Sequence, residues 1–244
     1  MCVAIYKPKN ANTPSLETLK QCWEANPDGA GFAIRHITEK NCIEIRKGFM
    51  SWGDFEKAYH DFKLDTYNDD MLLHFRIATS GGVCAGNTHP FPVTPKVQHL
   101  KHTDLYTNTA LIHNGVLPLT PDNKQLSDTM GLCQLLSGVT GNLKNAIKLV
   151  EPLIGTNKLA LMLPDTVVLA GQWEQIGGVY FSNLNWQYRA GWFNDWQDDG
   201  YAMLATKSEL KKLKRGICPI CGLKTVSNDP FGWYCESCGE IWDK

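Results

Sequence analysis

The sequence has 244 residues, of which 43% are hydrophobic and 20% charged, a composition typical of a globular protein with one or two domains. The formal net charge of −1 gives the molecule no overall field that would steer it to nucleic acid or to a membrane. No apolar run approaches the roughly 20 residues that a membrane-spanning helix needs. The odd number of cysteines, nine, and an N-terminus without the pattern of a secretory signal predict a cytoplasmic protein with reduced thiols.

Short runs of apolar residues bounded by Pro, Gly and Asn predict strands, and apolar residues at helical spacing predict helices. The expected strands are 3–6, 31–37, 42–49, 71–78, 105–117, 159–163, 166–170 and 179–181. The expected helices are one that begins at Ser51, one over 127–136 and one over 143–154. Two helices between sets of strands favour a layered α+β sandwich over an alternating βαβ fold.

Cys2 is the first residue with a chemical implication. A cysteine at position 2 is small enough for the initiator methionine to be removed, and it would then carry both a thiol and a free α-amino group. The reference pKa of an α-amine is about 7.7–8.0, so the amine is partly neutral at pH 7 and can act as a base. A nucleophile and a base on one residue fit acyl transfer. Taken alone, Cys2 is more often the second residue of an ordinary protein.

Four further residues could serve a cysteine that attacks an amide. Asn114 and Gly115 follow an apolar strand, and an amide and a backbone N–H there could bind an oxyanion. Arg76 lies on the polar face of the strand 71–78 and could bind a carboxylate, and Asp128 stands at a helix start and could bind an ammonium group. Each also has an ordinary interpretation: an Asn-Gly turn, a surface arginine and a helix cap.

The C-terminal cysteines follow a second pattern. Cys218 and Cys221 form one Cys-x2-Cys pair, thirteen residues separate it from a second pair, Cys235 and Cys238, and a glycine follows each pair. This spacing predicts a closed, tetrahedral site in which four cysteines bind structural zinc. Four unrelated buried thiols and a redox dithiol are the alternatives.

A basic segment precedes these cysteines. The stretch 206–215 holds five Lys and Arg residues against Glu209, and it reads as a short helix or a linker. A basic run beside a zinc ribbon could contact phosphates of nucleic acid, although a solvated linker helix is the more ordinary reading. We therefore predict three parts: a domain over 2–205, a basic linker over 206–215 and a zinc ribbon over 216–244.

Six segments occur in the order seen in class II glutamine amidotransferases, and the chain resembles that family over residues 2–185. The segments are Cys2, Asn-Pro-Asp-Gly-Ala-Gly-Phe at 26–32, His-Phe-Arg-Ile-Ala-Thr at 74–79, Asn-Thr-His-Pro-Phe at 87–91, His-Asn-Gly at 113–115 and Ser-Asp-Thr at 127–129. The likeness is greatest to the small stand-alone members. It is more distant to the glutaminase halves of glucosamine-phosphate synthase and asparagine synthetase.

The resemblance implies a four-layer αββα sandwich of the N-terminal-nucleophile hydrolase type. It also implies that glutamine is hydrolysed to glutamate and ammonia through a γ-glutamyl thioester. On this basis Cys2 resembles the nucleophile with its α-amine as the base, and Asn114 and Gly115 resemble the oxyanion hole.

The remaining matches imply substrate contacts. Arg76 and Thr79 resemble the residues that bind the glutamine α-carboxylate, and Asp128 resembles the partner of the α-amino group. His89 resembles a residue that orders the wall of the site. The chain departs from many larger members at Ser80, where they have histidine, and at residues 26–27, where they carry an arginine.

Two other functions fit parts of the pattern. One is an amide hydrolase with a different substrate, which would not need the Arg76 and Asp128 pair. The other is an inactive amidotransferase-like protein that binds nucleic acid or protein through its zinc ribbon. For an active amidotransferase, the sequence names no ammonia acceptor; a modified nucleobase or a partner synthetase would fit the ribbon and the basic segment.

Overall fold

The computed structural model describes residues 2–36, 42–62, 68–78, 82–121, 123, 125–139, 142–189, 203–204, 211–219, 222–228, 232–235 and 241–243. The chain divides into two compact units, Met1–Phe193 and Asn194–Lys244. The residues on both sides of the boundary predicted at 205–206 lie outside the described ranges. None of the described helices is both long and apolar enough to span a bilayer.

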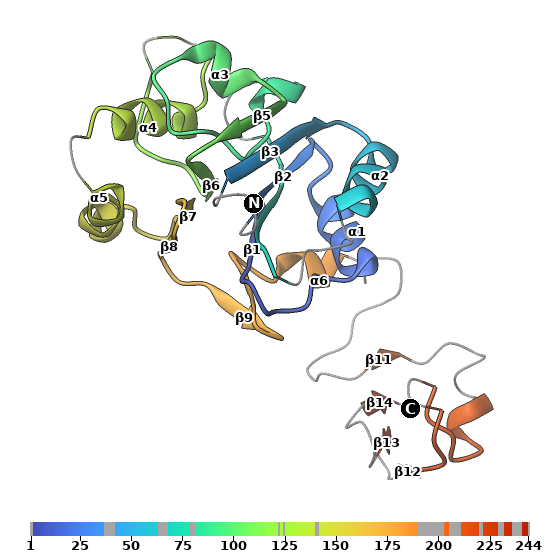
Figure 1. Cartoon of the computed structure of the whole chain (residues 1–244). Coiled ribbons are helices and arrows are strands. Elements are labelled where there is room, and N and C mark those ends of the chain that lie inside the picture. Colours follow the sequence, from blue (N-terminus) through green and yellow to red (C-terminus); the bar gives the residue numbers. More distant parts are fainter. Residues whose placement is uncertain are drawn as a thin grey trace. The chain divides into compact units, whose positions relative to one another are not determined.

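A seven-stranded antiparallel sheet forms the centre of the first unit (Figure 1). The strand order is β5-β3-β2-β4-β1-β10-β9, so β1 pairs with β4 on one side and with β10 on the other. Val3 is opposite Phe75 and Ile5 is opposite Phe181. The strands are β1 (Val3–Lys7), β2 (Ala30–His36), β3 (Cys42–Phe49), β4 (Asp70–Phe75), β5 (Asp104–Thr107), β9 (Glu174–Ile176) and β10 (Val179–Phe181).

A smaller antiparallel sheet packs against the first. It consists of β6 (Ala110–Asn114), β7 (Lys158–Met162) and β8 (Val167–Ala170) in that order. Buried residues from both sheets form one cluster, in which small side chains such as Ala4 and Ala160 meet larger ones such as Leu72 and Met162. Because successive strand residues point to opposite faces, β1, β2 and β4 also supply side chains to a second core on the other face of the large sheet.

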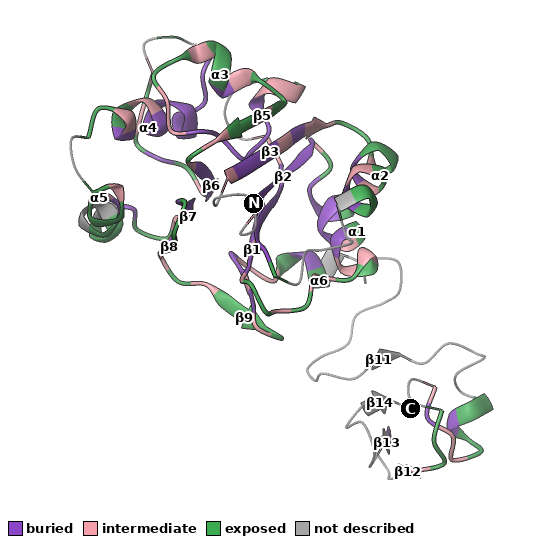
Figure 2. Cartoon of the chain, viewed as in Figure 1, coloured by how far each residue is buried: buried purple, intermediate pink, exposed green. Residues whose placement is uncertain are grey.

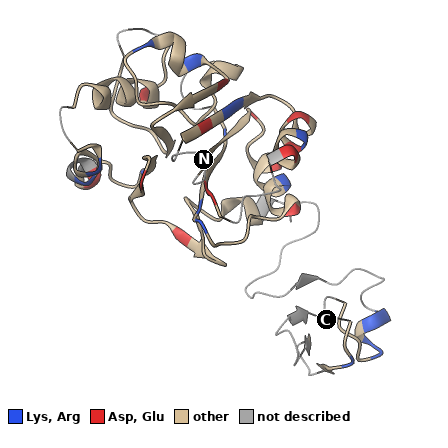
Figure 3. Cartoon of the chain, in the orientation of Figure 1, with Lys and Arg blue, Asp and Glu red and all other residues tan. Residues whose placement is uncertain are grey.

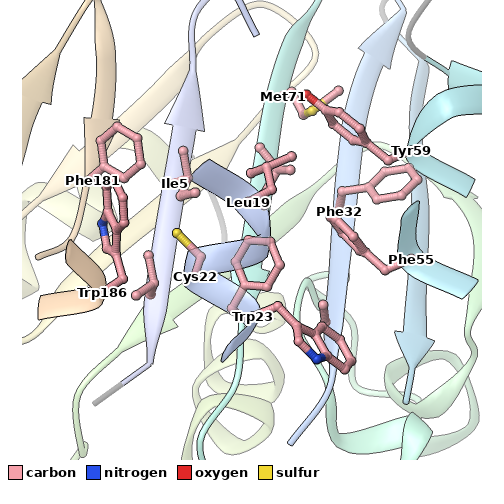
Figure 4. Packing of buried hydrophobic residues seen from close by; sticks show 14 of the residues in the cluster. Ile5, Leu19, Cys22, Trp23, Phe32, Phe55, Tyr59, Met71, Phe181 and Trp186 are labelled. Carbon is pink, nitrogen blue, oxygen red and sulfur yellow. The ribbon is translucent and has the colours of Figure 1, made fainter. Parts of the chain in front are cut away.

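Helices cover the other face of the large sheet. The helices α1 (Leu16–Ala25), α2 (Trp52–Phe62) and α6 (Asn185–Arg189) share a cluster of buried side chains with β1, β2, β4 and β10. Figure 4 shows Leu19, Cys22 and Trp23 of α1 lying over the strands. The N-terminus of α1 is capped by Ser15, whose Oγ accepts a hydrogen bond from the Thr18 backbone N–H at 3.1 Å.

A third core lies between the small sheet and the helices α4 (Asp128–Ser137) and α5 (Leu143–Val150). Figure 2 shows the buried residues concentrated in the central strands and on the inner sides of the helices. Three shorter elements complete the unit. They are the 3-10 helices η2 (Ala85–Asn87) and η3 (Glu151–Leu153) and the helix α3 (Val97–Lys101).

The predicted mixture of helices and strands is confirmed as an α+β fold, but some predicted elements differ from those observed. The strand expected over 105–117 is two strands in different sheets, β5 and β6, and the chain turns at Asn108 and Thr109. The helix expected over 143–154 ends at Val150, and η3 follows. Pro152 lacks the N–H that would continue α-helical hydrogen bonding.

The second unit contains a four-stranded sheet in the order β11-β14-β13-β12. Its strands are β11 (Met203–Leu204), β12 (Val226–Asn228), β13 (Gly232–Cys235) and β14 (Ile241–Asp243). Its small core includes Leu213, Cys218 and Trp233. The basic residues on both sides of Leu213 are exposed; they are Lys211, Lys212, Lys214 and Arg215. Figure 3 shows the basic residues of this segment in blue.

Candidate active site

Cys2 lies immediately before β1, and its thiol contacts the backbone of Ile77, just beyond the end of β4. Cys2 Sγ lies 3.3 Å from the Ile77 carbonyl oxygen, to which it donates, and 3.3 Å from the Ile77 nitrogen, which donates to it. Burial raises the pKa of the Cys2 thiol above its ordinary value, and the hydrogen bond with Ile77 opposes this shift. The resting thiol is therefore protonated, and an attack through sulfur needs a base.

The segment that follows β4 is held by the turn at Asp28 and Gly29. Arg76 N–H donates to the Gly29 carbonyl at 2.8 Å, and Asp28 N–H donates to the Arg76 carbonyl at 3.0 Å. Asp28 Oδ2 accepts a hydrogen bond from Ala78 N–H at 2.8 Å. Gly29 has φ of 116°, which favours glycine. Asp28 and Gly29 thus hold the backbone of Arg76 and Ala78 in place.

Arg76 was expected on the polar face of a strand, with a surface residue as the ordinary alternative. The structure corrects this: β4 ends at Phe75, and Arg76 is 4% exposed. Its Nη1 donates to the Gly82 carbonyl at 3.1 Å, as does Asn87 Nδ2 at 2.9 Å. A buried guanidinium places a strong positive charge inside the protein, where a carboxylate ligand gains more from it than in water.

Asp128 is the first residue of α4. Ser127 caps this helix by accepting a hydrogen bond from Met130 N–H at 3.2 Å, so Asp128 itself is not the cap. The Asp128 carboxylate accepts hydrogen bonds from Leu117 N–H at 2.8 Å and from Thr129 N–H at 2.7 Å. These contacts fix a buried carboxylate in one orientation, and each oxygen keeps further capacity to accept hydrogen bonds.

Asn114 ends β6, and Gly115 follows it with φ of 136°. Asn114 Nδ2 lies 2.8 Å from Ser182 Oγ, while Asn114 Oδ1 is buried with no hydrogen-bond donor among the described residues. A Cβ atom on Gly115 would overlap the side chain of Asn157. Asn157 in turn holds His113 Nε2 at 2.9 Å through its Oδ1 atom.

Three histidines lie buried together beside these residues. His89 packs on His74 with ring centroids 4.1 Å apart and the rings tilted by 39°, and His74 Nε2 lies 3.0 Å from the His113 carbonyl oxygen. Burial lowers the pKa of His74 to about 3 and also lowers the pKa values of His89 and His113. All three rings are therefore neutral at pH 7. Both ring nitrogens of His89 lack a hydrogen-bond partner among the described residues.

These elements converge on one pocket. Five residues predicted from the sequence line it: Cys2, Arg76, His89, Gly115 and Asp128. Asn114 is adjacent to Gly115 but does not line the pocket, and Thr79 lies outside the described residues. The lining also includes residues to which the sequence assigned no role. They are Ile77, Asn87, His113, Ser127 and Thr129.

Two residues outside the lining were also missed. Ser182 and Asn183 follow β10, and Asn183 Nδ2 donates to the Cys2 carbonyl at 2.9 Å. The available signal was weak, because a Ser-Asn pair after a short apolar strand is common in loops.

The four C-terminal cysteines are only partly described. Cys218 is buried, the side chain of Cys235 is not described, and Cys221 and Cys238 lie outside the described residues. No cluster of three or more metal-binding side chains occurs in the described part of the chain. The backbone turns back at the first pair: Gly222 N–H donates to the Cys218 carbonyl at 3.0 Å, and Gly222 has φ of 73°.

No protein-family model matches the sequence, and no curated protein matches it either. Among solved structures, the fold is similar to that of glutamine phosphoribosylpyrophosphate (PRPP) amidotransferase from B. subtilis complexed with ADP and GMP, with 15% sequence identity and a TM-score of 0.46. The similarity covers 74% of this chain and 41% of that structure, so this chain spans about two fifths of the length of the amidotransferase.

Proposed function

We propose that the protein hydrolyses glutamine to glutamate and ammonia, with Cys2 as the nucleophile. The observation that carries this proposal is the pocket itself. It brings a cysteine thiol, a buried guanidinium and a buried carboxylate together from positions 2, 76 and 128. A thiol, a cation and an anion that line one pocket match the γ-amide, the α-carboxylate and the α-ammonium group of glutamine.

The proposed reaction begins when Cys2 Sγ attacks the amide carbon of glutamine. The thiol proton passes to the α-amine of Cys2, which must be the first residue of the mature chain, and from there to the departing ammonia. A C–S bond forms, the C–N bond breaks, and water then hydrolyses the thioester to glutamate and the free thiol. Asn114 and the Gly115 N–H would stabilise the negatively charged oxygen in both steps.

In the substrate complex, Arg76 binds the α-carboxylate and Asp128 binds the α-ammonium group. Thr79 is proposed as a second carboxylate contact, and His89 as part of the wall. The neutral state of the histidines supports this assignment, because a charged ring would compete with Arg76 for the carboxylate or repel the ammonium group. An amide substrate without an amino-acid head would leave Arg76 and Asp128 unused.

The fold proposed for this activity is the four-layer αββα sandwich. Three cores in succession support it: one between helices and the large sheet, one between the sheets and one between the small sheet and helices.

For the second unit, we propose a structural zinc held by Cys218, Cys221, Cys235 and Cys238, which would fold the tail and take no part in the chemistry. The four exposed basic residues around Leu213 could contact phosphates. They make nucleic acid, or a synthetase that binds nucleic acid, the first ammonia acceptor to test.

A glutaminase assay on the purified full chain tests the proposal. Intact mass should show Cys2 as the first residue, and glutamate should form from glutamine. Cys2→Ala should abolish turnover and leave the thermal unfolding midpoint within about 1 °C. Cys84→Ala is the matched control, because Cys84 is an exposed thiol outside the pocket lining. A full rate for Cys2→Ala, or quantitative retention of Met1 in an active enzyme, would overturn the mechanism.

A substitution at Arg76 tests substrate binding separately from the chemical step. Arg76→Lys keeps a positive charge but loses the two-pronged contact with a carboxylate, so KM for glutamine should rise far more than kcat falls. Initial rates at varied glutamine concentrations measure both constants. An unchanged KM would show that Arg76 does not bind the substrate.

A further inference from the structure

Ser182 connects the strand of the nucleophile to the residue proposed as an oxyanion donor. Its side chain is 1% exposed, and its Oγ lies 2.9 Å from Ala4 N and 2.8 Å from Asn114 Nδ2. The Ser182 backbone N–H also donates to the Ala4 carbonyl at 2.8 Å. One serine therefore joins β1, two residues after Cys2, to the end of β6.

In the orientation of the Asn114 amide just described, the hydrogen bonds around Ser182 leave one donor and one acceptor without a partner. Three N–H groups reach Ser182 Oγ, the third being Asn183 Nδ2 at 3.4 Å, so the hydroxyl hydrogen has no acceptor among the described residues. At the same time, Asn114 Oδ1 is buried without a donor. A buried carbonyl oxygen without a hydrogen bond is unfavourable.

If the Asn114 carboxamide is rotated by a half turn, the Ser182 hydroxyl hydrogen and Asn114 Oδ1 become hydrogen-bond partners of each other. The two ends of a carboxamide have nearly the same shape, so the hydrogen bonds around them decide which end faces which way. After the rotation, the Ser182 hydroxyl donates to Asn114 Oδ1 and still accepts from Ala4 N–H. The Asn114 NH2 group then occupies the place of the unpartnered oxygen.

We propose that Ser182 is a positioning residue that fixes the Asn114 amide with its oxygen toward the hydroxyl and its NH2 group toward the oxyanion. This inference rests on the proposed function for its catalytic meaning. The opposite orientation would turn a carbonyl oxygen toward a developing negative charge, which repels it. Asn183 completes the arrangement, because it holds the Cys2 carbonyl from the neighbouring position.

Kinetics distinguish positioning from a structural role. Ser182→Ala should lower kcat and change KM by less than about two-fold. The loss should not exceed that of Asn114→Ala, which is expected to be roughly 100- to 1,000-fold. In the double variant Ser182→Ala/Asn114→Ala, kcat should equal that of Asn114→Ala within about two-fold. A purely structural role would lower kcat by the same factor in both backgrounds and would overturn the proposal.

A matched control is available in α4. Ser137 Oγ donates to the Gln134 carbonyl at 2.6 Å, so Ser137→Ala removes a serine hydroxyl and a hydrogen bond away from the pocket. This variant should keep the parent kcat and KM. Thermal unfolding of all variants reports whether they fold.

A neutron crystal structure of the unmodified, deuterated protein decides the orientation without any activity. Nitrogen and oxygen scatter neutrons differently, and deuterium is visible. The Asn114 atom that faces Ser182 should be oxygen, with a deuterium on Ser182 Oγ directed at it; a nitrogen there would overturn the proposal even if Ser182→Ala does not fold. If the parent chain shows no glutaminase activity, the proposed function fails while the neutron result still tests the orientation.

Discussion

Gly115 shows how one residue serves both the fold and the proposed chemistry. Its φ of 136° is rarely adopted by residues with a side chain, and a methyl group there would meet Asn157. Asn157 is the partner that orients His113, so a shift of Asn157 would spread to the pocket. Glycine is required here for its backbone conformation and for the space around it.

Gly115→Ala should therefore lower the free energy of unfolding by about 1–3 kcal/mol, the usual range for a residue held in a strained conformation. It should also lower kcat, because the Gly115 N–H would move. Gly53→Ala is the matched control: Gly53 lies exposed in α2 with nothing near its added methyl group, so stability should stay equal or rise by up to about 1 kcal/mol. Urea unfolding measures both, and equal stabilities for the two variants would contradict this account.

The buried histidines predict a loss of stability in acid. The pKa of His74 is lowered to about 3 and that of His89 is lowered as well, whereas both return to about 6.5 in the unfolded chain. Below pH 6.5 the unfolded chain thus binds protons that the folded chain does not. The free energy of unfolding should be constant above pH 7 with respect to these groups. It should fall below pH 6.5 by up to about 1.4 kcal/mol per pH unit for each histidine.

Urea unfolding at pH 7.5 and pH 5.5 checks this expectation. His89→Phe keeps a ring between its two neighbouring rings and removes no hydrogen bond found among the described residues, so it should flatten the pH dependence. His60→Gln, on the exposed side of α2, should leave the pH dependence as in the parent. A steeper fall in His89→Phe would contradict burial as the cause.

At the scale of elements, α1 is the largest part of the fold that the sequence analysis missed. Its signals were present: Ser15 as the cap, Glu17 in the first turn, and the apolar residues Leu16, Leu19 and Trp23 at helical spacing. They lie between two segments that read as strands, and a ten-residue helix is short enough to be taken for a connection. The strand pattern at 105–117 failed for a different reason. Alternation predicts a strand but does not state which sheet it joins.

A substitution at Leu19 measures how much α1 contributes to the free energy of unfolding. It is fully buried between α1 and the large sheet, so Leu19→Ala should cost about 2–5 kcal/mol of unfolding free energy. Leu135→Ala is the matched change in α4, where the leucine is 62% exposed, and it should change stability by less than about 0.5 kcal/mol. Denaturant unfolding compares the two. Similar costs for both variants would mean that α1 is not part of the main cooperative unit.

At the scale of the whole molecule, the two units should depend on different interactions. The first has three apolar cores, whereas the described core of the second is small, with Leu213, Cys218 and Trp233 among its buried residues. So small a core rarely holds a module together without a metal or a disulfide. We expect one zinc per chain, with Zn–S distances near about 2.3 Å. A chelator should expose the backbone amides of the second unit to hydrogen exchange and leave glutaminase activity unchanged.

Metal analysis of cysteine variants completes this test. Cys218→Ser should reduce the zinc content to near zero, whereas Cys42→Ser, in β3 of the first unit, should retain it. Loss of hydrolysis on chelation, with the first unit still folded, would show that the tail takes part in the site.

The sequence singled out five of the residues that line the pocket, but not the contacts that hold them. Arg76 and Asp128 are charged residues within segments that the sequence analysis recognised. Their residue types therefore suggest a role before their positions in the structure are known. Ser182 and Asn157 act only through neighbours that are 68 and 44 residues away, respectively, and no local pattern reveals such contacts. What the sequence could not supply is therefore the set of long-range hydrogen bonds that orient the predicted residues.

The central position of β1 has a consequence for how the protein is made. The first strand of the chain pairs with β4 and also with β10, whose residues are the last of the large sheet to be synthesised. At roughly 5–20 residues per second, translation leaves the N-terminal segment without its final neighbour for about ten seconds or more. If Met1 is removed as proposed, a peptidase would have free access to it during that interval. Afterwards Ser182 and Asn183 hydrogen-bond to the backbone of Ala4 and Cys2, so on this proposal the N-terminus would be processed before the sheet is completed.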